Sequence, residues 1–447
     1  MGHSESTKRA AARLIAAAFL GGPLDKGVEA RVASVTNASQ RAIRGLVARM
    51  IAHFGTKGRP REVRVRRFVW EDRGFQRFSS KEGFECPTVE CPEDEFWPRE
   101  MLPAAGAPRG WKVLPITTVG ELATRLNLNA NELGWLADGR GLERKVSEER
   151  LRHYRYRWIG KRDGSARLVE APKQRLRSIQ RFLLEKVLNG IPPHEAVHGF
   201  RKGRSIKTFT APHAGREVVL KLDLRNFFPS VIAARVRAIF LTAGYPESVA
   251  EVLTGLCTNS VPAAVITEAP VEKGYYFRKL YGQAHLPQGA PTSPALANLC
   301  AFRLDCRLAG LAKAAGATYT RYADDLLFSG DPEFERSVER FYIKVCAIAL
   351  EEGFEVNTRK TRVMRRSVSQ RAAGLVLNEK VNIGRREFDA LKAILTNCVR
   401  TGPAEENRGK VADFYSHLAG RIGHVRMVNR ARGEKLLGIF EKIKWGN

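Results

Sequence analysis

The feature that most constrains this chain is a pair of adjacent acids, Asp324 and Asp325, between two β-prone segments. Residues 318–322 precede the pair and residues 326–329 follow it, and this pattern predicts a β-hairpin with a tight polar turn. Two neighbouring carboxylates repel each other and need a cation or a proton. Because no His or Cys lies near them, a divalent metal with oxygen ligands is one answer. The alternative for this stretch alone is an ordinary solvated turn.

A third acid, Asp223, ends a short apolar segment, residues 218–223, that predicts a buried strand. Pro229 is placed to open a helix over residues 231–241. Residues 286–294 form a turn-rich loop between Asp223 and the acid pair. An acid on one strand and an acid pair on a hairpin can hold two Mg²⁺ ions about 3.5–4 Å apart, which is the arrangement for in-line phosphoryl or nucleotidyl transfer.

Taken in this order, these segments resemble the motifs of the reverse transcriptase family. The resemblance covers roughly residues 150 to 445, and several motifs in the same order are more specific than any one of them. The first three palm motifs correspond to Asp223, residues 286–293 and Tyr322–Asp325, and residues 353–361 and 373–378 are similar to the fourth and the fifth.

The resemblance implies roles in catalysis for the acids and for one lysine. Asp223 and Asp324 would bind both Mg²⁺ ions, with Leu224 as a further contact to metal and nucleotide, and Asp325 would lie closer to the primer end. One metal would lower the pKa of the primer hydroxyl, and the other would hold the triphosphate. Lys360 resembles the lysine that protonates the leaving pyrophosphate; the alternative is a surface lysine.

The same resemblance assigns residues to the incoming nucleotide. Phe228 resembles an aromatic gate that lies under the sugar and excludes a 2′-hydroxyl, and the alternative is a core Phe. Gln288 and Gly289 resemble the loop that packs on the nucleotide. Arg167 and Lys173 are candidates for holding the triphosphate or the template, with surface salt bridges as an equal alternative.

Two further segments have the composition of a nucleic-acid interface. Residues 153–158 alternate Arg with aromatic side chains in a predicted strand, which suits phosphates and stacked bases, and Asp163-Gly164 predicts a hairpin turn after it. Residues 198–206 form a glycine-punctuated basic loop whose backbone N–H groups can grip phosphate. The candidates for contacting nucleic acid are Arg155, Arg157, Arg204, His213 and Tyr322.

The basic loop is similar to the one shared by group II intron and retron reverse transcriptases. Retron enzymes carry Asn-Ala-x-x-His after it, where residues 209–213 here are Phe-Thr-Ala-Pro-His. They also carry Val-Thr-Gly where this chain has Ala372-Ala373-Gly374. The retron-like class is still favoured. It implies compact enzymes that reverse transcribe a structured noncoding RNA from the 2′-hydroxyl of a guanosine, giving branched multicopy single-stranded DNA. It also implies antiphage defence, often with an effector protein.

Charge and composition agree with a polyanionic partner. The chain has 75 Lys and Arg against 47 Asp and Glu, a net charge of +28, which favours binding to a polyanion. The resemblance implies that the partners are RNA, a DNA product and dNTPs. No apolar segment reaches the ~18 residues of a transmembrane helix, and the N-terminus has no apolar signal sequence. We therefore expect no membrane partner and a cytoplasmic location. Cys86 and Cys91 lack a second pair at zinc-site spacing, so a zinc site is not favoured.

The expected fold is α+β, a right-hand polymerase of fingers, palm and thumb with a helical N-terminal extension. Residues 118–137 predict a pair of packing helices, with a DNA-reading helix-turn-helix as the alternative. Residues 257–285 are an insertion of unassigned role, and a long helix is expected from Ser293 to about Ala315. The expected parts are a basic extension with an acidic linker over 1–100, a helical part of the polymerase over 101–150, fingers and palm over 151–380, and a helical thumb over 381–447.

Two other functions stay open. One is a different bacterial reverse transcriptase, from a group II intron or another defence system, although the expected lack of a maturase-type tail argues against a mobile intron. The other is a non-catalytic RNA-binding protein on a polymerase fold. Because all three acids are present, metal-dependent primer extension separates this last possibility from an enzyme.

Overall fold

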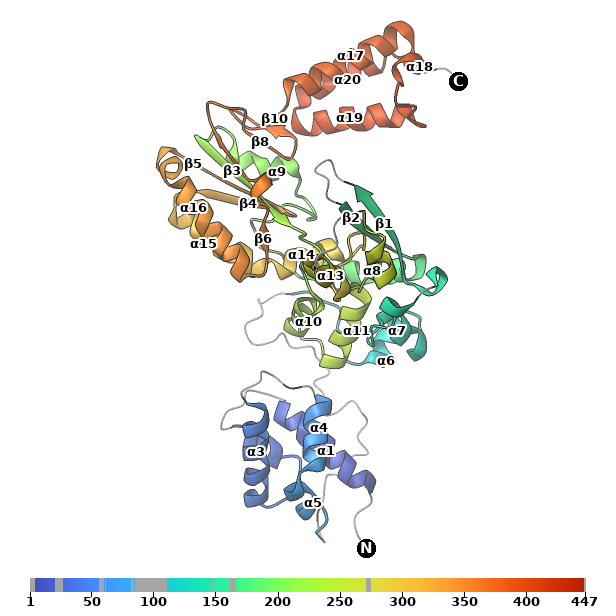
Figure 1. Ribbon diagram of the computed structural model, residues 1–447, viewed down its shortest axis with the longest axis vertical. Coiled ribbons are helices and arrows are strands. Elements are labelled where there is room, and N and C mark those ends of the chain that lie inside the picture. Colours follow the sequence, from blue (N-terminus) through green and yellow to red (C-terminus); the bar gives the residue numbers. More distant parts are fainter. Residues whose placement is uncertain are drawn as a thin grey trace. The chain divides into compact units, whose positions relative to one another are not determined.

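The computed structural model describes residues 5–20, 27–55, 60, 62–81, 84, 111–146, 148–160, 166–270 and 275–445. The chain divides into two compact units, Met1–Met101 and Leu102–Asn447 (Figure 1). Cys86, Cys91, most of the acidic linker and the Asp163-Gly164 turn lie outside the described residues.

The first unit is helical and has a hydrophobic core of its own. Its helices are α1 (Glu5–Leu20), α2 (Gly27–Ala33), α3 (Gln40–Phe54), α4 (Glu62–Glu71) and α5 (Arg73–Ser79). Phe19, Met50 and Phe75 are among the side chains buried between them. Asp72 caps α5 by accepting a hydrogen bond from Phe75 N (2.8 Å), and Arg49 pairs with the same carboxylate.

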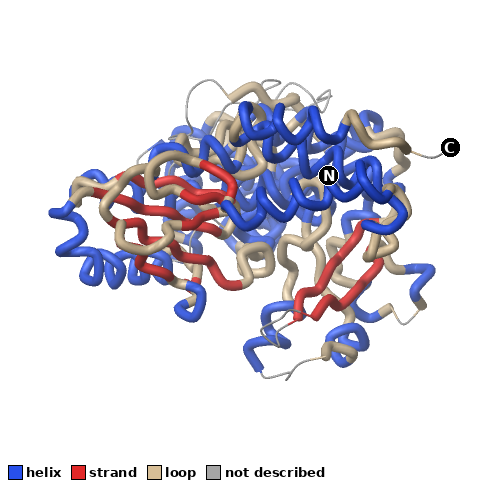
Figure 2. Tube along the Cα trace, turned by 90° about the horizontal axis from the view of Figure 1, so that it is seen from above, coloured by secondary structure: helices blue, strands red, loops and turns tan. Residues whose placement is uncertain are grey.

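The second unit begins with two short helices and a β-hairpin. Helices α6 (Val119–Arg125) and α7 (Ala130–Ala137) form the predicted pair, and Thr118 and Asn129 cap them. Strands β1 (Tyr154–Gly160) and β2 (Ala166–Pro172) pair antiparallel, and α8 (Gln174–Lys186) follows. The hairpin is a sheet separate from the central one, as Figure 2 shows.

A central antiparallel sheet brings the predicted motifs together. Its strand order is β4-β5-β3-β6, with β7 also paired to β3. Strand β3 is almost wholly buried, and its register sets Asp223 opposite Asp325. The strands are β3 (Val218–Arg225), β4 (Thr318–Tyr322), β5 (Asp325–Gly330), β6 (Glu355–Val356) and β7 (Arg362–Arg365). Helices α15 (Phe302–Ala314) and α16 (Pro332–Glu351) pack against the sheet (Figure 1).

Two helices differ from the expected ones. The helix expected from Ser293 to Ala315 is interrupted at Ala301, whose φ and ψ are −88° and 4°, so that α14 (Ser293–Cys300) precedes α15. The helix expected at 231–241 begins later, as α10 (Ala233–Thr242). Ile232 forms a β-bridge with His285, and this extended pairing holds the preceding backbone out of the helix.

The other helices of the second unit lie between the motif segments and after them in the chain. Short helix α9 (Ile206–Thr210) follows the basic loop, α11 (Glu247–Cys257) packs on α7 and α10, and the 257–285 insertion forms α12 (Ala263–Thr267) and α13 (Tyr275–Gly282). The C-terminal helices are α17 (Arg385–Thr401), α18 (Pro403–Glu406), α19 (Phe414–Val428) and α20 (Arg430–Phe440). A small sheet of β8 (Arg371–Ala372), β9 (Leu375–Val376) and β10 (Asn382–Ile383) leads into them, and Leu375 and Ile383 join their core.

A buried ion pair fastens the β4–β5 hairpin to the helices beneath it. Arg321 has no exposed surface, and its guanidinium makes two hydrogen bonds of 2.7 Å to the Asp305 carboxylate on α15. Its Nη1 also donates to Asn298 Oδ1 and to the carbonyl of Ala323 (both 3.0 Å). Ala323 has a φ of 55°, a left-handed conformation that is unfavourable for alanine. Arg321 thus stabilises the turn that carries Asp324.

We expect Asp305→Ala to lower the free energy of unfolding by about 3–5 kcal/mol, because it leaves a buried arginine without its anion. The measurement is the urea unfolding curve of the full chain. Glu335→Ala is the matched control, since it removes the partner of Arg365 in an exposed pair (3.0 Å) that contributes about 0–1 kcal/mol. Equal losses in the two variants would contradict the role of the buried pair.

Candidate active site

Three carboxylates meet at one end of the central sheet. Asp223 and Asp325 are directly paired between β3 and β5. Asp324 is fixed by the turn before β5, where its carbonyl accepts a hydrogen bond from Leu224 N (2.8 Å). The predicted strand and hairpin therefore adjoin each other, and Leu224 lies buried between the first acid and the turn.

Two lysines neutralise part of this acidic cluster. Lys360 Nζ lies 3.0 and 3.2 Å from the two carboxylate oxygens of Asp223, and Lys221 Nζ lies 3.1 Å from Asp325 Oδ1. Burial raises the pKa of Asp324, and the charge of Asp223 raises it further. Burial also raises the pKa of Asp325, against the opposing effect of Lys221. The cluster is therefore electrostatically unfavourable unless cations lie beside it.

The donor set fits hard divalent cations. All three side chains offer carboxylate oxygens, the ligands that Mg²⁺ prefers, and a strand pairing holds two of them opposite each other. Within the part of the chain that the structure describes, no three His, Cys, Asp or Glu side chains form a ready-made metal site. Since Lys360 and Lys221 contact Asp223 and Asp325, these ion pairs have to loosen for a metal to be bound.

Aromatic rings lie beside the acids. The half-buried ring of Phe228 lies 6.3 Å from that of Phe200, and Phe200 lies 6.3 Å from Tyr322. Phe200 belongs to the basic loop and is 52% exposed. This loop passes close to the acid-bearing turn, because a Cβ on Gly199 would be only 2.6 Å from Ala323 N. The loop thus contributes an exposed ring to the site.

The predicted nucleotide loop is docked on strand β2. The backbone carbonyl of Gln288 accepts a hydrogen bond from the backbone N–H of Glu170 (2.9 Å). Gly289 has a φ of 136°, and a Cβ there would lie 2.9 Å from Glu170 O, so only glycine fits. The buried Glu170 side chain is anchored in turn by His285 (3.0 Å) and Asn259 (2.7 Å). The loop is therefore positioned by the β1–β2 hairpin.

The other predicted cations lie in different surroundings. Arg155, Arg157 and Arg167 are exposed on the β1–β2 hairpin, and Arg204 is exposed on the basic loop. The ammonium of Lys173 instead donates to the carbonyls of Glu149 (2.7 Å) and Arg150 (2.9 Å). These contacts favour a structural role for Lys173 in holding the 3₁₀ turn Glu149–Leu151.

His213 is in the core and not at a nucleic-acid surface, which corrects the expectation for this residue. It is fully buried, with Nε2 2.8 Å from Thr320 Oγ1 and Nδ1 2.7 Å from Ser329 Oγ. Thr320 uses its only hydroxyl proton on Phe209 O (2.9 Å), so it accepts from Nε2–H. His213 therefore links β4 to β5, and its burial favours the neutral imidazole because it lowers the pKa of the side chain.

The sequence reasoning missed two polar neighbours of the acids. Lys221 precedes Asp223 by two residues, and the two-residue period of a strand places both side chains on one face, so this signal was available. The backbone N–H of Asn357 donates a hydrogen bond to the backbone carbonyl of Asp223 (2.7 Å). Only the pairing of distant segments reveals Asn357.

Comparisons with known proteins point to one family. Residues 159–389 match the family model described as reverse transcriptase (RNA-dependent DNA polymerase). The chain is 45% identical over 289 residues to the retron Mx65 reverse transcriptase of Myxococcus xanthus, covering 64% of each chain. It is 36% identical over 341 residues to the retron Mx162 reverse transcriptase of the same organism, covering 72% of this chain and 66% of the relative.

A third relative comes from another organism. The retron Ec86 reverse transcriptase of Escherichia coli is 32% identical over 246 residues, covering 54% of this chain and 69% of the relative. The chain spans just under two thirds of the length of the two Myxococcus xanthus relatives.

Burial lowers the pKa of His213 to about 3, with smaller contributions from His198 and Arg216. In the unfolded chain the pKa of a histidine is about 6.5. Between about pH 6.5 and pH 3 the unfolded chain therefore binds a proton that the folded chain does not, and the free energy of unfolding falls as the pH falls through this range. At pH 5, His213 lowers the free energy of unfolding by about 2 kcal/mol relative to a pH well above 6.5.

We expect His213→Asn, which keeps a short polar side chain but does not titrate, to lose less stability than the wild type between pH 7 and pH 5. The measurement is the free energy of unfolding in urea at both pH values. Since the variant is destabilised at both, only the difference between them is compared. An unchanged pH dependence would contradict the neutral, buried state of His213.

Proposed function

Since the chain belongs to the reverse transcriptase family, we propose that it is an RNA-directed DNA polymerase of the retron type. The observation that carries this proposal is the meeting of Asp223, Asp324 and Asp325 at one end of the central sheet. In this proposal the β1–β2 hairpin belongs to the fingers, the central sheet to the palm, and helices α17 to α20 to the thumb.

The proposed reaction joins a primer hydroxyl to an incoming dNTP. Two Mg²⁺ ions bound by the three aspartates would lower the pKa of that hydroxyl and neutralise the triphosphate. Lys360, whose Nζ lies 3.0 Å from Asp223 in this structure, would move to the leaving pyrophosphate and donate its proton there. The Arg321 network would keep the Asp324 turn in one conformation during the reaction.

The nucleotide would lie between the Phe228 ring and the Gln288–Gly289 loop. Phe228 is half-buried beside Phe227 (5.7 Å between ring centroids), so part of its side chain stays accessible, as a gate under the sugar requires. The loop is anchored on Glu170, which fits a fixed wall for the nucleotide.

A structured noncoding RNA is the proposed template and primer, and multicopy single-stranded DNA linked to RNA is the proposed product. Two observations support this: the relatives are named retron reverse transcriptases, and the net charge of +28 suits a polyanion. Antiphage defence with an effector protein, in the cytoplasm, is the proposed setting. Among the described residues, no helix is long and apolar enough to cross a bilayer.

A non-catalytic RNA-binding protein is a second candidate. The ion pairs of Asp223 with Lys360 and of Asp325 with Lys221 favour it, because they neutralise two of the acids without a metal. A different bacterial reverse transcriptase is the other alternative. The primer-extension and co-purification experiments below separate these possibilities.

We expect Asp324→Asn to reduce Mg²⁺-dependent primer extension on an RNA template to below about one hundredth of the wild-type rate, since even the loss of a group that only hydrogen-bonds to a metal ligand costs about 10–100-fold. RNA affinity, measured in parallel by filter binding, stays near the wild-type value. The control is Asp331→Asn, an exposed acid that pairs with Arg216. A wild-type chain that binds RNA but extends no primer would favour the non-catalytic candidate.

The retron type is tested on nucleic acid that co-purifies with the chain expressed from its native locus. After RNase digestion, one discrete short DNA on a denaturing gel, absent from the Asp324→Asn variant, is the expected result. A smear, or no DNA beside active primer extension, would point to another bacterial reverse transcriptase.

We expect Phe228→Ala to admit ribonucleotides, because removal of the ring opens space for a 2′-hydroxyl. The ratio of extension efficiencies for dNTPs and rNTPs should fall roughly 10–100-fold, the range for loss of a pocket contact. Phe228→Tyr keeps the ring and is expected to keep the discrimination. If the alanine variant discriminates like the wild type, Phe228 is not the gate.

A further inference from the structure

The 257–285 insertion is firmly attached to the β1–β2 hairpin through helix α13. Phe277 and Tyr281 pack their rings against Trp158, each 5.6 Å from it between centroids. Trp158 Nε1 also donates to Val265 O (3.0 Å) in α12. Because its inner side is fixed in this way, α13 presents its outer side in one orientation.

The outer side of α13 alternates cations with aromatic rings. A helix has 3.6 residues per turn, so the side opposite the buried Leu280 and Tyr281 carries four side chains. Their order around the helix is Arg278, Tyr275, Lys279 and Tyr276. All four are exposed, with Tyr275 80% and Tyr276 51% accessible. Rings between cations are typical of surfaces that bind single-stranded nucleic acid.

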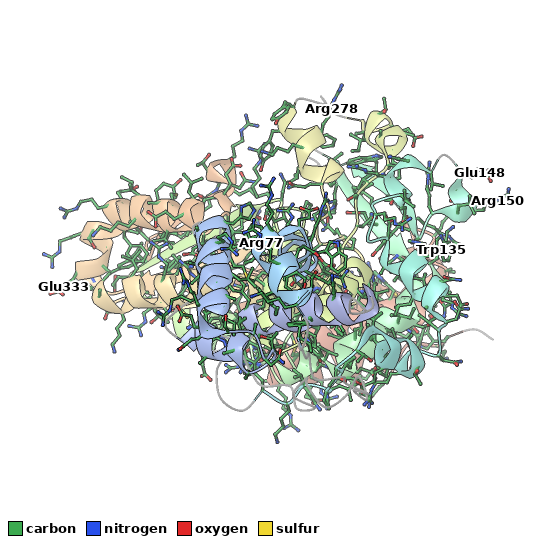
Figure 3. All side chains as sticks on the ribbon, turned by 90° about the horizontal axis from the view of Figure 1, so that it is seen from below. Arg77, Trp135, Glu148, Arg150, Arg278 and Glu333 are labelled. Carbon is green, nitrogen blue, oxygen red and sulfur yellow. The ribbon has the colours of Figure 1, made fainter. Side chains whose placement is uncertain are left out.

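One edge of this surface continues into a pocket. Arg278 lines a pocket of about 440 Å³ together with Arg144 and Lys145, and Val261 and Ile266 give it apolar walls. In Figure 3 the Arg278 side chain projects from the helix at the periphery of the view. Three cations around an apolar pocket suit a ligand with negative charge and a flat apolar part, as in a nucleotide unit.

The opposite edge reaches the catalytic strand. The Arg225 guanidinium lies over the Tyr276 ring, 6.0 Å from its centroid. Arg225 is the last residue of β3 and follows Asp223 by two residues. Arg225 also pairs with Glu355 (3.0 Å), which fixes its position. A strand lying along α13 would thus run between the pocket and the end of the strand that carries the first catalytic acid.

We propose that the outer face of α13, with the Arg144–Lys145–Arg278 pocket, binds the single-stranded RNA template where it extends beyond the duplex in the active site. Bases would stack on Tyr275 and Tyr276, and the cations would contact phosphates. A single strand is the favoured occupant, because paired bases in a duplex do not offer their faces to protein rings. This inference rests on the proposed polymerase function and assigns a role to the insertion.

The experiment measures the affinity of the full chain for two primer–templates that share one DNA–RNA duplex but carry RNA 5′ overhangs of different length, one short and one long. In the wild type the long overhang is expected to bind more tightly, and the ratio of the two dissociation constants reports the overhang alone. Tyr275→Ala should lower that ratio about tenfold, the effect of losing one stacked base. The triple variant Arg144→Ala/Lys145→Ala/Arg278→Ala should lower the ratio of the two dissociation constants and also make that ratio less dependent on salt.

A matched control removes the same charge elsewhere. Arg336→Ala/Arg340→Ala/Lys344→Ala takes three exposed cations from α16 and should keep the wild-type ratio. If the wild type gains no affinity from the overhang, or if the α13 and pocket variants keep the gain, the inference is wrong even where primer extension is normal. If the wild type extends no primer at all, the proposed function fails instead. Thermal unfolding of each variant checks that these exposed substitutions leave the fold intact.

Discussion

The arrangement of the site depends on a guanidinium that has no access to water. Arg321 satisfies its donors within the core, on Asp305, Asn298 and Ala323 O, and its ring neighbour Phe227 lies 5.6 Å away. The backbone of the same residue bonds to Ala196 and His198, which bring the basic loop alongside β4. One residue thus joins the acid turn, the basic loop and the α14–α15 helices. A buried ion pair is seldom a net source of stability, so its value here lies in fixing one arrangement.

The sheet that Arg321 supports gathers negative charge. Register places Asp223 against Asp325, and burial makes the charged forms of Asp324 and Asp325 costly. The lysine pairs reduce that cost without removing the carboxylates. In the proposed function, divalent cations would replace the two ammonium groups beside the carboxylates, as metal-dependent nucleotidyl transfer requires.

The surroundings of the acids are built from segments that are distant in sequence. The β1–β2 hairpin positions the Gln288–Gly289 loop through Glu170, and its Trp158 ring packs against Phe277 and Tyr281 of α13. The same hairpin therefore connects the proposed nucleotide wall to the proposed template surface. Its exposed arginines lie on the strands that make both connections, so the proposed nucleotide and RNA contacts share one rigid support.

The sequence by itself determined the local elements and the chemistry. Short-range periodicity and turn residues predict the strand that carries Asp223, the hairpin around Asp324 and Asp325, and the helix pair at 118–137. The strand runs two residues further than expected, to Arg225. The order of the motifs indicated the family that the comparisons show. The roles expected of Phe228 and Gln288 came from the family resemblance, whereas that of Arg204 came from the composition of its glycine-punctuated basic loop.

Only the tertiary structure decided which side chains meet. Nothing local in the sequence distinguishes His213, which is buried between two strands, from a surface histidine, or Lys173, which is held by two carbonyls, from a free lysine. The pairing of Lys360 with Asp223 and the burial of Arg321 on Asp305 likewise join residues on separate elements. Periodicity acts over a few residues and fixes the face on which a side chain lies, whereas its partners depend on strand register and helix packing between segments that are far apart in the chain.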